Sequence, residues 1–143
     1  SGLKGELQRI LGLDREWPVA LVGLGNLGAA LFHYKGFSRQ GFRVAVVFDN
    51  DPAKIGRELD GVPIVSTRDV AREVKERSLQ IAVLAVPADA AQTVTDQLVA
   101  AGIKAILNFA PARLKVSKDV RLKNVDLSIE LETLSFYLAQ AAR

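Results

Sequence analysis

An α/β fold built on a doubly wound parallel sheet is the fold class that this sequence predicts. From Pro18 onward, short β-branched stretches alternate with helical patterns, which is typical of a parallel sheet with helices on both faces. The stretches VAVVF, IAVLAV and AIL are almost entirely apolar, as strands are when both of their faces are buried. A glycine-rich turn between the first strand and the first helix fits the same architecture.

The same patterns place the individual elements. Strands are expected at residues 19–22, 43–48, 62–65, 81–86, 105–108 and, more weakly, 120–125. Helices are expected to start near Asn26, Thr67 and Ala88, and Gly41 and Gly102 stand where helices should end. The hydroxyl of Thr67 is expected to cap its helix.

Two further helices flank this core in the sequence. The first covers residues 3–11 and carries one apolar stripe. The last has two opposed apolar faces: Leu127, Leu131, Leu134, Leu138 and Ala141 on one, Ile129 and Phe136 on the other. Because a terminal helix needs only one apolar face for its own domain, the second face predicts contact with another chain in a homodimer. The alternative is that the second face is two scattered exposed residues.

The composition excludes several classes of protein. A length of 143 residues predicts one domain, and 49% apolar with 24% charged residues is typical of globular domains. The absence of cysteine and the single histidine, His33, exclude thiolate and multi-histidine metal sites, so no metal is expected. Neither a membrane-spanning run nor a signal peptide is visible, which predicts a cytoplasmic protein without membrane contact. The start at Ser1-Gly2 and the lack of methionine indicate a domain cut from a longer chain.

A net charge of +3 is too small for a nucleic-acid-binding surface, but its distribution is uneven. Residues 113–123 carry five basic side chains, Arg113, Lys115, Lys118, Arg121 and Lys123, against Asp119 alone. A solvated loop is the favoured interpretation, because no aromatic side chain lies between the charges to stack on bases. A patch that contacts phosphates is the alternative.

The strongest local motif is G-x-G-x-x-G, formed by Gly23, Gly25 and Gly28. The first glycine permits a tight turn, the second lets a pyrophosphate approach the backbone, and the third lets helix and strand pack closely. Backbone N–H groups at the start of the helix attract the anion. The motif therefore predicts a Rossmann-like dinucleotide site that includes the intervening residues Leu24, Asn26 and Leu27.

An acidic residue at the end of the second strand is the next requirement of such a site. Asp49 ends VAVVFD, and Asn50 and Asp51 follow it with no adjacent arginine. Because two carboxylates here would repel a 2′-phosphate, the predicted cofactor is NAD rather than NADP. The alternative is an ordinary turn-forming acid before Pro52.

Loops after the fourth and fifth strands should flank the nicotinamide half of the ligand. They contain Val86 and Pro87 in one loop and Asn108, Phe109, Ala110 and Pro111 in the other. These loops would form a rigid apolar floor, although the prolines could equally serve only to end the strands. His33 and Tyr34 fall at the far end of the first helix, so no general acid or base is visible and an enzyme is not expected.

Four blocks, GLGNLGAALFHYKGF, FDNDPAKIG, GIKAILNFAP and NVDLSIELETLSFYL, together resemble the C-terminal domain of the Rex family of bacterial redox-sensing transcriptional repressors. The resemblance implies an NAD(H)-binding Rossmann domain over residues 1–143 with a C-terminal helix, about 126–142, that two subunits exchange. It also implies a winged-helix DNA-binding domain that this chain lacks, and release from operator DNA as the NADH/NAD+ ratio rises.

The resemblance assigns roles to single residues as well. It implies that residues 23–28 bind the pyrophosphate and Asp49 the adenosine ribose. Tyr34 matches the family tyrosine near the nicotinamide, and Asp126 matches the aspartate that reports the redox state by changing hydrogen-bond partners. Together these two form the expected redox switch. The apolar loops predict tighter binding of NADH than of the cationic NAD+.

Two other functions remain open at this point. One is a nucleotide-binding fragment of an NAD-dependent oxidoreductase, which would turn over NADH with a carbonyl compound. The other is a module for CoA or a nucleotide sugar on the same fold, because a fold alone does not fix a function.

Overall fold

The protein is described by a computed structural model in which residues 16–125 and 138–140 are placed. The expected helix at residues 3–11, most of the expected C-terminal helix and Asp126 lie outside these described residues. Among the residues that the structure does describe, no helix is both long enough and apolar enough to cross a membrane.

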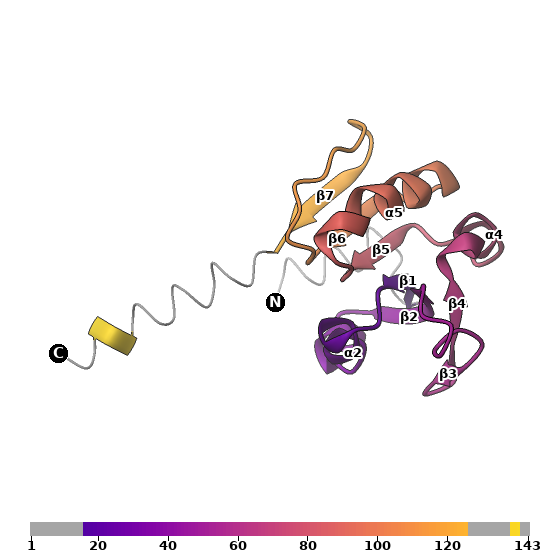
Figure 1. Ribbon diagram of the computed structural model, residues 1–143, viewed down its shortest axis with the longest axis horizontal. Helices are drawn as coiled ribbons and strands as arrows, with labels where there is room; N and C mark the ends of the chain where they lie inside the picture. The colour runs from indigo at the N-terminus through magenta and orange to yellow at the C-terminus, as the bar shows by residue number, and fades with distance from the viewer. Residues whose placement is uncertain (1–15, 126–137, 141–143) are drawn as a thin grey trace.

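A mostly parallel sheet forms the centre of the domain (Figure 1). Its strands are β1 (Trp17–Val22), β2 (Phe42–Asp49), β3 (Glu58–Leu59), β4 (Val62–Ser66), β5 (Ile81–Leu84), β6 (Ala105–Asn108) and β7 (Arg121–Asn124). They lie in the order β3-β4-β2-β1-β5-β6-β7, and only the β3–β4 pair is antiparallel. Because the order reverses between β1 and β5, the carboxyl ends of these strands form the crevice where such sheets bind ligands. The predicted α/β fold is confirmed.

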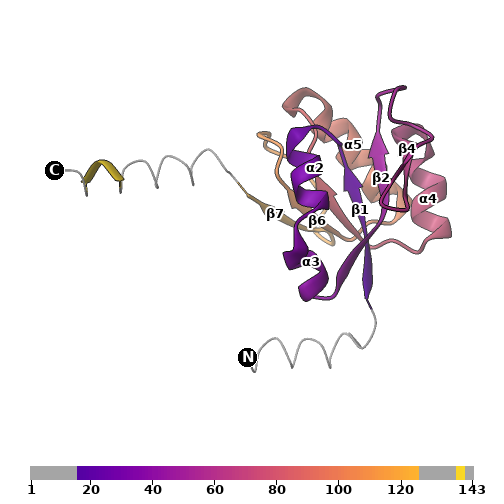
Figure 2. The same ribbon diagram turned by 90° about the horizontal axis from the view of Figure 1, so that it is seen from below.

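Helices cover the two faces of the sheet (Figure 2). On one face lie α2 (Asn26–Phe32) and α3 (Lys35–Arg39). On the other lie α4 (Val70–Glu76), which follows a 3-10 turn at Thr67–Asp69, and α5 (Ala88–Ala101). Each face has its own apolar core: Phe48, Leu84 and Leu98 belong to the α4/α5 side, and Leu21, Val47 and Val83 to the α2/α3 side. Successive side chains of a strand point to opposite faces of the sheet, so neighbours such as Val47 and Phe48 pack in different cores.

The six expected strands are present, with small differences at their ends. β5 stops at Leu84, two residues earlier than expected, because Val86 and Pro87 belong to the turn into α5. Pro87 is the N-cap of that helix, and its backbone is extended. At the other end of α5, Gly102 takes a φ of +117°, which confirms it as a C-terminal glycine.

The expectation of one helix between Asn26 and Gly41 was wrong. α2 ends at Phe32, and α3 starts at Lys35 after the extended residue Tyr34, with φ −70° and ψ 110°. The Tyr34 ring packs edge-on against Phe37, with ring centroids 5.2 Å apart. The ring also lies over Gly36, where an added Cβ would come within 2.2 Å of it. This packing of Tyr34 on α3 accompanies the break, which no local helix propensity indicates.

The capping role expected of Thr67 was also wrong. The capping hydroxyl belongs to Ser66, which accepts a hydrogen bond from Arg68 N at 3.1 Å. Thr67 is buried and donates its hydroxyl to the side-chain oxygen of Asn50 instead. The capping residue is therefore one position earlier than expected, and Thr67 instead lies in the crevice at the carboxyl ends of the strands.

Strand β3 was not expected from the sequence. It pairs with β4 across the two-residue turn Asp60-Gly61, whose φ angles are +49° and +82°. Positive φ at both positions is the type I′ hairpin turn that Asp-Gly favours. The Asp-Gly turn signal is present in the sequence, but the strand before it, β3, has only two residues and is too short to show a strand pattern.

Candidate nucleotide-binding site

A cavity of about 340 Å³ opens at the carboxyl ends of β1, β2 and β5. It is lined by the glycine loop 23–27, by Phe48–Asn50 at the end of β2 and by residues that lead into α5. This is the switch point at which an open parallel sheet binds ligands. The structure therefore brings residues 23–27, Asp49, Val86 and Pro87 together around one cavity, whereas Gly28 does not line it.

The three glycines differ in what their surroundings require. Gly23 has a φ of +97°, and an added Cβ would lie 2.6 Å from the Ala85 carbonyl oxygen. A Cβ at Gly28 would lie 1.9 Å from the Gly23 carbonyl oxygen, so helix and strand touch there. A Cβ at Gly25 would meet no atom within 4 Å. The open space beside Gly25 and the N–H groups of the first helical turn fit a pyrophosphate.

Asp49 has a second role that the sequence did not predict. Its Oδ2 accepts a hydrogen bond from Leu24 N at 2.7 Å, and its Oδ1 accepts one from Asp51 N at 2.8 Å. A carboxylate has about four lone-pair sites, so both oxygens can still accept from ribose hydroxyls. Asp49 thus fixes the glycine loop and also offers an acceptor beside it.

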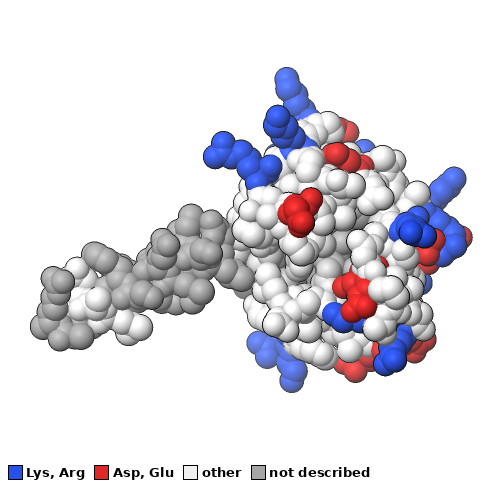
Figure 3. Space-filling view, in the orientation of Figure 1, with Lys and Arg blue, Asp and Glu red and all other residues white. Residues whose placement is uncertain are grey.

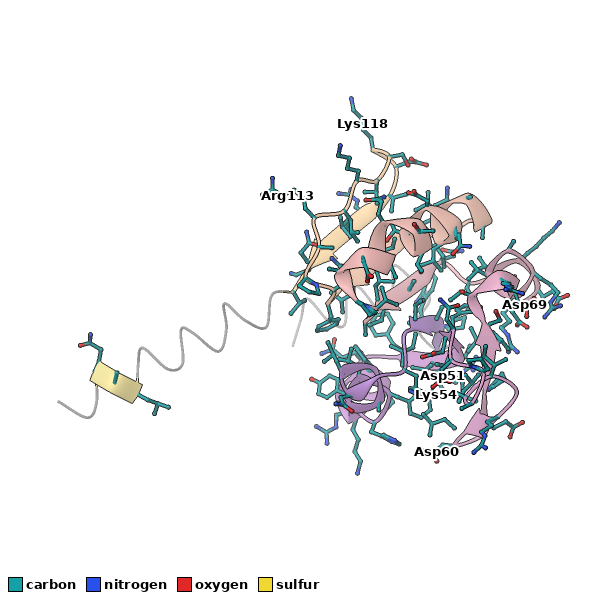
Figure 4. The ribbon with its side chains drawn as sticks, viewed as in Figure 1. Asp51, Lys54, Asp60, Asp69, Arg113 and Lys118 are labelled. Carbon is teal, nitrogen blue, oxygen red and sulfur yellow. The ribbon has the colours of Figure 1, made fainter. Side chains whose placement is uncertain are left out.

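Lys54 is a functional candidate that sequence reasoning missed. Its Nζ donates to the Leu24 carbonyl oxygen at 2.6 Å, and the side chain is half-buried. Figure 4 shows Lys54 beside Asp51 in the segment that follows β2. The contact spans 30 residues of sequence, so no local pattern reveals it. The available signal was the DPAK sequence that follows shortly after Asp49, the residue predicted to bind the ribose.

Asn50 and Thr67 line the far part of the cavity, next to Ala90 and Val94 of α5. The hydroxyl of Thr67 donates to the Asn50 side-chain oxygen, which fixes the orientation of that amide. Neither residue was expected in the site. Their place beside Asp49 and two apolar side chains suits a flat heterocycle attached to the ribose.

The second predicted loop does not line this cavity. Asn108 is 1% exposed and ties the loop to itself: Nδ2 donates to the Ala110 and Ala112 carbonyl oxygens at 3.3 Å, and Oδ1 accepts from Ala110 N at 2.9 Å. Phe109 packs against the apolar core on the α2/α3 side. Of the expected floor, Val86 and Pro87 therefore line the glycine-loop cavity, whereas residues 108–111 do not.

Tyr34 lies in a different cavity. It is 59% exposed and contributes to an apolar hollow of about 600 Å³ on the α2/α3 side of the sheet. We call this hollow the open face; residues of β1, β2, β5, β6 and β7 line it, among them Ile81, Val83 and Leu107. In the described part of the chain no helix fills it. Asp126, the other member of the expected switch, lies outside the described residues.

The remaining candidates lie away from the glycine loop. His33 faces Asp60 at 3.8 Å, and both side chains are exposed. Within residues 16–125 and 138–140, no group of three or more His, Asp or Glu side chains could hold a metal ion.

The basic stretch 113–123 is only partly a loop. Residues 113–120, which we call the basic loop, precede β7, whereas Arg121 and Lys123 belong to β7. Arg113 and Lys118 project from the domain in Figure 4, and basic side chains gather at the same end in Figure 3.

Comparisons with known proteins match this chain to one domain family and to several related proteins. Residues 14–112 match the family described as CoA binding domain. The redox-sensing transcriptional repressor Rex of Syntrophomonas wolfei is 53% identical over 137 residues, which are 96% of this chain and 65% of that protein. The crystal structure of RSP, a Rex-family repressor, in complex with β-NADH is 39% identical with a TM-score of 0.86, covering 99% of this chain and 68% of that one.

The chain belongs to the CoA-binding domain family and to the Rex repressors. A second RSP structure, in complex with β-NAD+ and operator DNA, matches with a TM-score of 0.85 and covers 99% of this chain and 65% of that one. The Rex proteins of Syntrophomonas wolfei and Streptomyces coelicolor, both similar to this chain, are named as redox-sensing transcriptional repressors. The chain spans between half and two thirds of the length of these curated relatives.

Proposed function

We propose that this chain is the NAD(H)-sensing domain of a redox-responsive repressor that acts in the cytoplasm. The observation that carries the proposal is the match along 99% of the chain to RSP, whose structures contain β-NADH or β-NAD+ with operator DNA. NADH binding would release the full-length dimer from its operator. DNA contact would be made by the winged-helix domain that the resemblance implies, outside residues 1–143.

The cavity at the glycine loop supports a dinucleotide as the ligand. The backbone at Gly25, Asn26 and Leu27 would hold the pyrophosphate, and Asp49 would accept from the adenosine ribose. Asp49 and Asp51 would repel a 2′-phosphate, which favours NAD(H) over NADP(H). The nicotinamide ring of the bound dinucleotide would be either oxidised or reduced, and the domain would respond to that difference. Among the described residues that line this cavity, Asp49 is the one titratable side chain, which supports binding rather than turnover.

The nicotinamide end of the site supports a preference for NADH. Val86 and Pro87 contribute apolar surface to the lining of the cavity. Removing the cationic ring of NAD+ from water costs more there than removing the uncharged ring of NADH. Residues 108–111 begin at Asn108, which pairs with Leu84 at the carboxyl end of β5, and this position supports their proposed place beside the nicotinamide end.

The open face supports a homodimer formed through the C-terminal segment. Its lining includes the basic residues Arg121 and Lys123 beside an apolar floor. Residues 126–137 combine apolar side chains with Asp126, Glu130 and Glu132 and contain no lysine or arginine. The segment of a second copy therefore complements the open face in both charge and hydropathy. Docked there, it would bring Asp126 towards Tyr34, which lines the same hollow.

Calorimetric titration with NADH and then NAD+ tests the sensor. One site per chain with tighter binding of NADH is expected, and equal affinities would contradict sensing. Asp49→Ala should weaken both by roughly 10- to 100-fold, because hydrogen bonds to a charged group are lost. Light scattering tests the dimer: Arg121→Glu with Lys123→Glu should shift it towards monomer, and an unchanged dimer would contradict docking on the open face.

CoA is the second candidate ligand, favoured by the CoA-binding family match over residues 14–112. The same calorimetry with CoA decides between them. Binding of CoA with no binding of either dinucleotide would replace the redox proposal. Steady oxidation of NADH with a simple carbonyl compound would instead support the oxidoreductase fragment.

A further inference from the structure

The backbone of Leu24, between the first two glycines of the motif, is held from both sides. Its N–H donates to Asp49 Oδ2 at 2.7 Å, and its carbonyl oxygen accepts from Lys54 Nζ at 2.6 Å. Both contacts are charge-assisted, and such hydrogen bonds are roughly twice as strong as neutral ones. The carboxylate of Asp49, at the end of β2, therefore holds the Gly23–Leu24 peptide group. The ammonium group of Lys54, in the turn that follows, holds the next peptide group, Leu24–Gly25.

A compact turn delivers Lys54 to this position. Asp51 Oδ1 accepts from Ala53 N at 2.9 Å, and the Asp51 carbonyl oxygen accepts from Lys54 N at 2.9 Å and from Ile55 N at 3.1 Å. The turn is pinned to β4, because Gly56 N donates to the Ile64 carbonyl oxygen at 2.9 Å. The Lys54 backbone is therefore fixed before its side chain reaches the glycine loop.

The carbonyl that Lys54 holds belongs to the same peptide group as the N–H of Gly25. In a trans peptide the C=O and the N–H point in opposite directions. Lys54 is not among the residues that line the cavity, whereas Gly25 lines it and has open space beside it. Drawing the Leu24 carbonyl towards Lys54 therefore turns the Gly25 N–H the other way, towards the ligand. Rotating this peptide would instead present a carbonyl oxygen to the pyrophosphate.

We propose that Lys54 is a positioning residue for the dinucleotide: its ammonium group locks the Leu24–Gly25 peptide so that the Gly25 N–H faces the pyrophosphate. The inference rests on the proposed NAD(H) function. Lys54 acts through the backbone, so its contribution is the same for every ligand with a pyrophosphate at this position. It does not contribute to the choice between the two redox states.

The test compares Lys54→Met, Lys54→Arg and the exposed-loop control Lys118→Met. Lys54→Met, which keeps the length and loses the donor, should weaken NADH, NAD+ and ADP-ribose by one common factor of roughly tenfold. The NADH/NAD+ affinity ratio should stay at its wild-type value. Lys54→Arg retains donors and should bind within about threefold of wild type. Lys118→Met should bind as wild type does.

NMR of the ligand-free chain separates positioning from general loosening of the fold. In Lys54→Met the Leu24 carbonyl 13C and Gly25 amide 15N resonances should move, while resonances of the β5 and β6 core stay in place. Wild-type affinity in Lys54→Met, a changed NADH/NAD+ ratio, or no rescue by arginine would each overturn the proposal. If the wild-type chain binds no dinucleotide, the proposed function fails, and unshifted resonances at Leu24 and Gly25 would overturn the peptide lock separately.

Discussion

The two halves of the sheet are built differently. The half formed by β1, β2 and β4 carries helices on both faces, and its glycine loop is held by Asp49 and Lys54. The half formed by β5, β6 and β7 has α5 on one face, while on the other it forms the floor of the open face. Described helices pack on both faces of the first half, which we call the closed half, although Val19 of β1 and Phe42 and Val44 of β2 also line the open face. The second presents an apolar surface suited to a further segment of chain.

In the proposed function this difference would separate ligand binding from assembly. The proposed pyrophosphate and ribose positions, at the glycine loop and Asp49, both lie in the first half. The open face, which Tyr34 also lines, is left uncovered by the residues that the structure describes. In the proposed sensor, the dinucleotide would bind in one half and a second copy would dock on the other.

The largest expected effect is in the closed half. Gly28→Ala places a Cβ 1.9 Å from the Gly23 carbonyl oxygen, so α2 must move off β1. We expect a loss of about 3 kcal/mol or more of unfolding free energy, measured by urea denaturation. Gly25→Ala is the matched control, because its Cβ meets nothing within 4 Å. It should unfold like wild type but bind NADH more weakly. Equal stability of the two variants would show that the loop is not tightly packed.

The next effect belongs to the open face. Leu107→Asp introduces a charge into the apolar floor, and burying an unpaired carboxylate opposes docking of a second copy. We expect the dimer dissociation constant to rise by roughly 100-fold in sedimentation equilibrium. Thr93→Asp on the exposed surface of α5 is the control, and it should leave the dimer unchanged. A Leu107→Asp dimer as tight as wild type would place the interface elsewhere.

A smaller effect is expected where β6 meets β7. Asn108 Nδ2 donates to Asn124 Oδ1 at 2.9 Å, and Val125 N donates to the Asn108 carbonyl oxygen at 2.8 Å. Asn124→Ala removes an acceptor from a buried amide and should cost about 1 kcal/mol of stability in thermal unfolding. Asn124→Asp keeps the acceptor and should be less destabilised. The reverse order would mean that this hydrogen bond contributes nothing.

The smallest effect is on the basic loop. A hydrogen bond from Ser117, then one from its own backbone and the charge of Lys104, lower the pKa of Asp119 from its ordinary value. A lowered pKa stabilises the folded chain above the unfolded-state value, and this stability is lost as pH falls through the folded value. Ser117→Ala should raise the pKa of Asp119 in an NMR titration below about pH 5. An unchanged titration would assign the lowered pKa to the backbone hydrogen bond of Asp119 and to Lys104 instead.

Much of the closed half could be predicted from the sequence because its signals are local. The glycine spacing, the apolar strands and Asp49 at a strand end all lie within single elements. Lys54 could not be predicted, because its partner Leu24 is 30 residues away and the contact depends on how the turn folds back. Asn50 and Thr67 were missed for the same reason: the side chains meet only through the pairing of β2 with β4.

The open half was predicted less well. Its strands were found, but nothing local indicates that residues 108–111 bond to themselves rather than line the glycine-loop cavity. The break at Tyr34 was missed although Gly36, a poor helix former, lies next to it; in the structure the Tyr34 ring packs over Gly36 and against Phe37. The redox-switch role of Tyr34 and Asp126 stays a prediction.

The short hairpin of β3 and β4 forms one edge of the described sheet and affects whether the sheets of two copies can pair edge to edge. An uncovered outer strand invites unwanted pairing with another sheet. Here the outer strand β3 has only two residues, one of them Glu58. At the opposite edge of the described sheet, β7 carries Arg121 and Lys123. Both edges therefore oppose pairing with the sheet of another copy, through shortness at one edge and charge at the other.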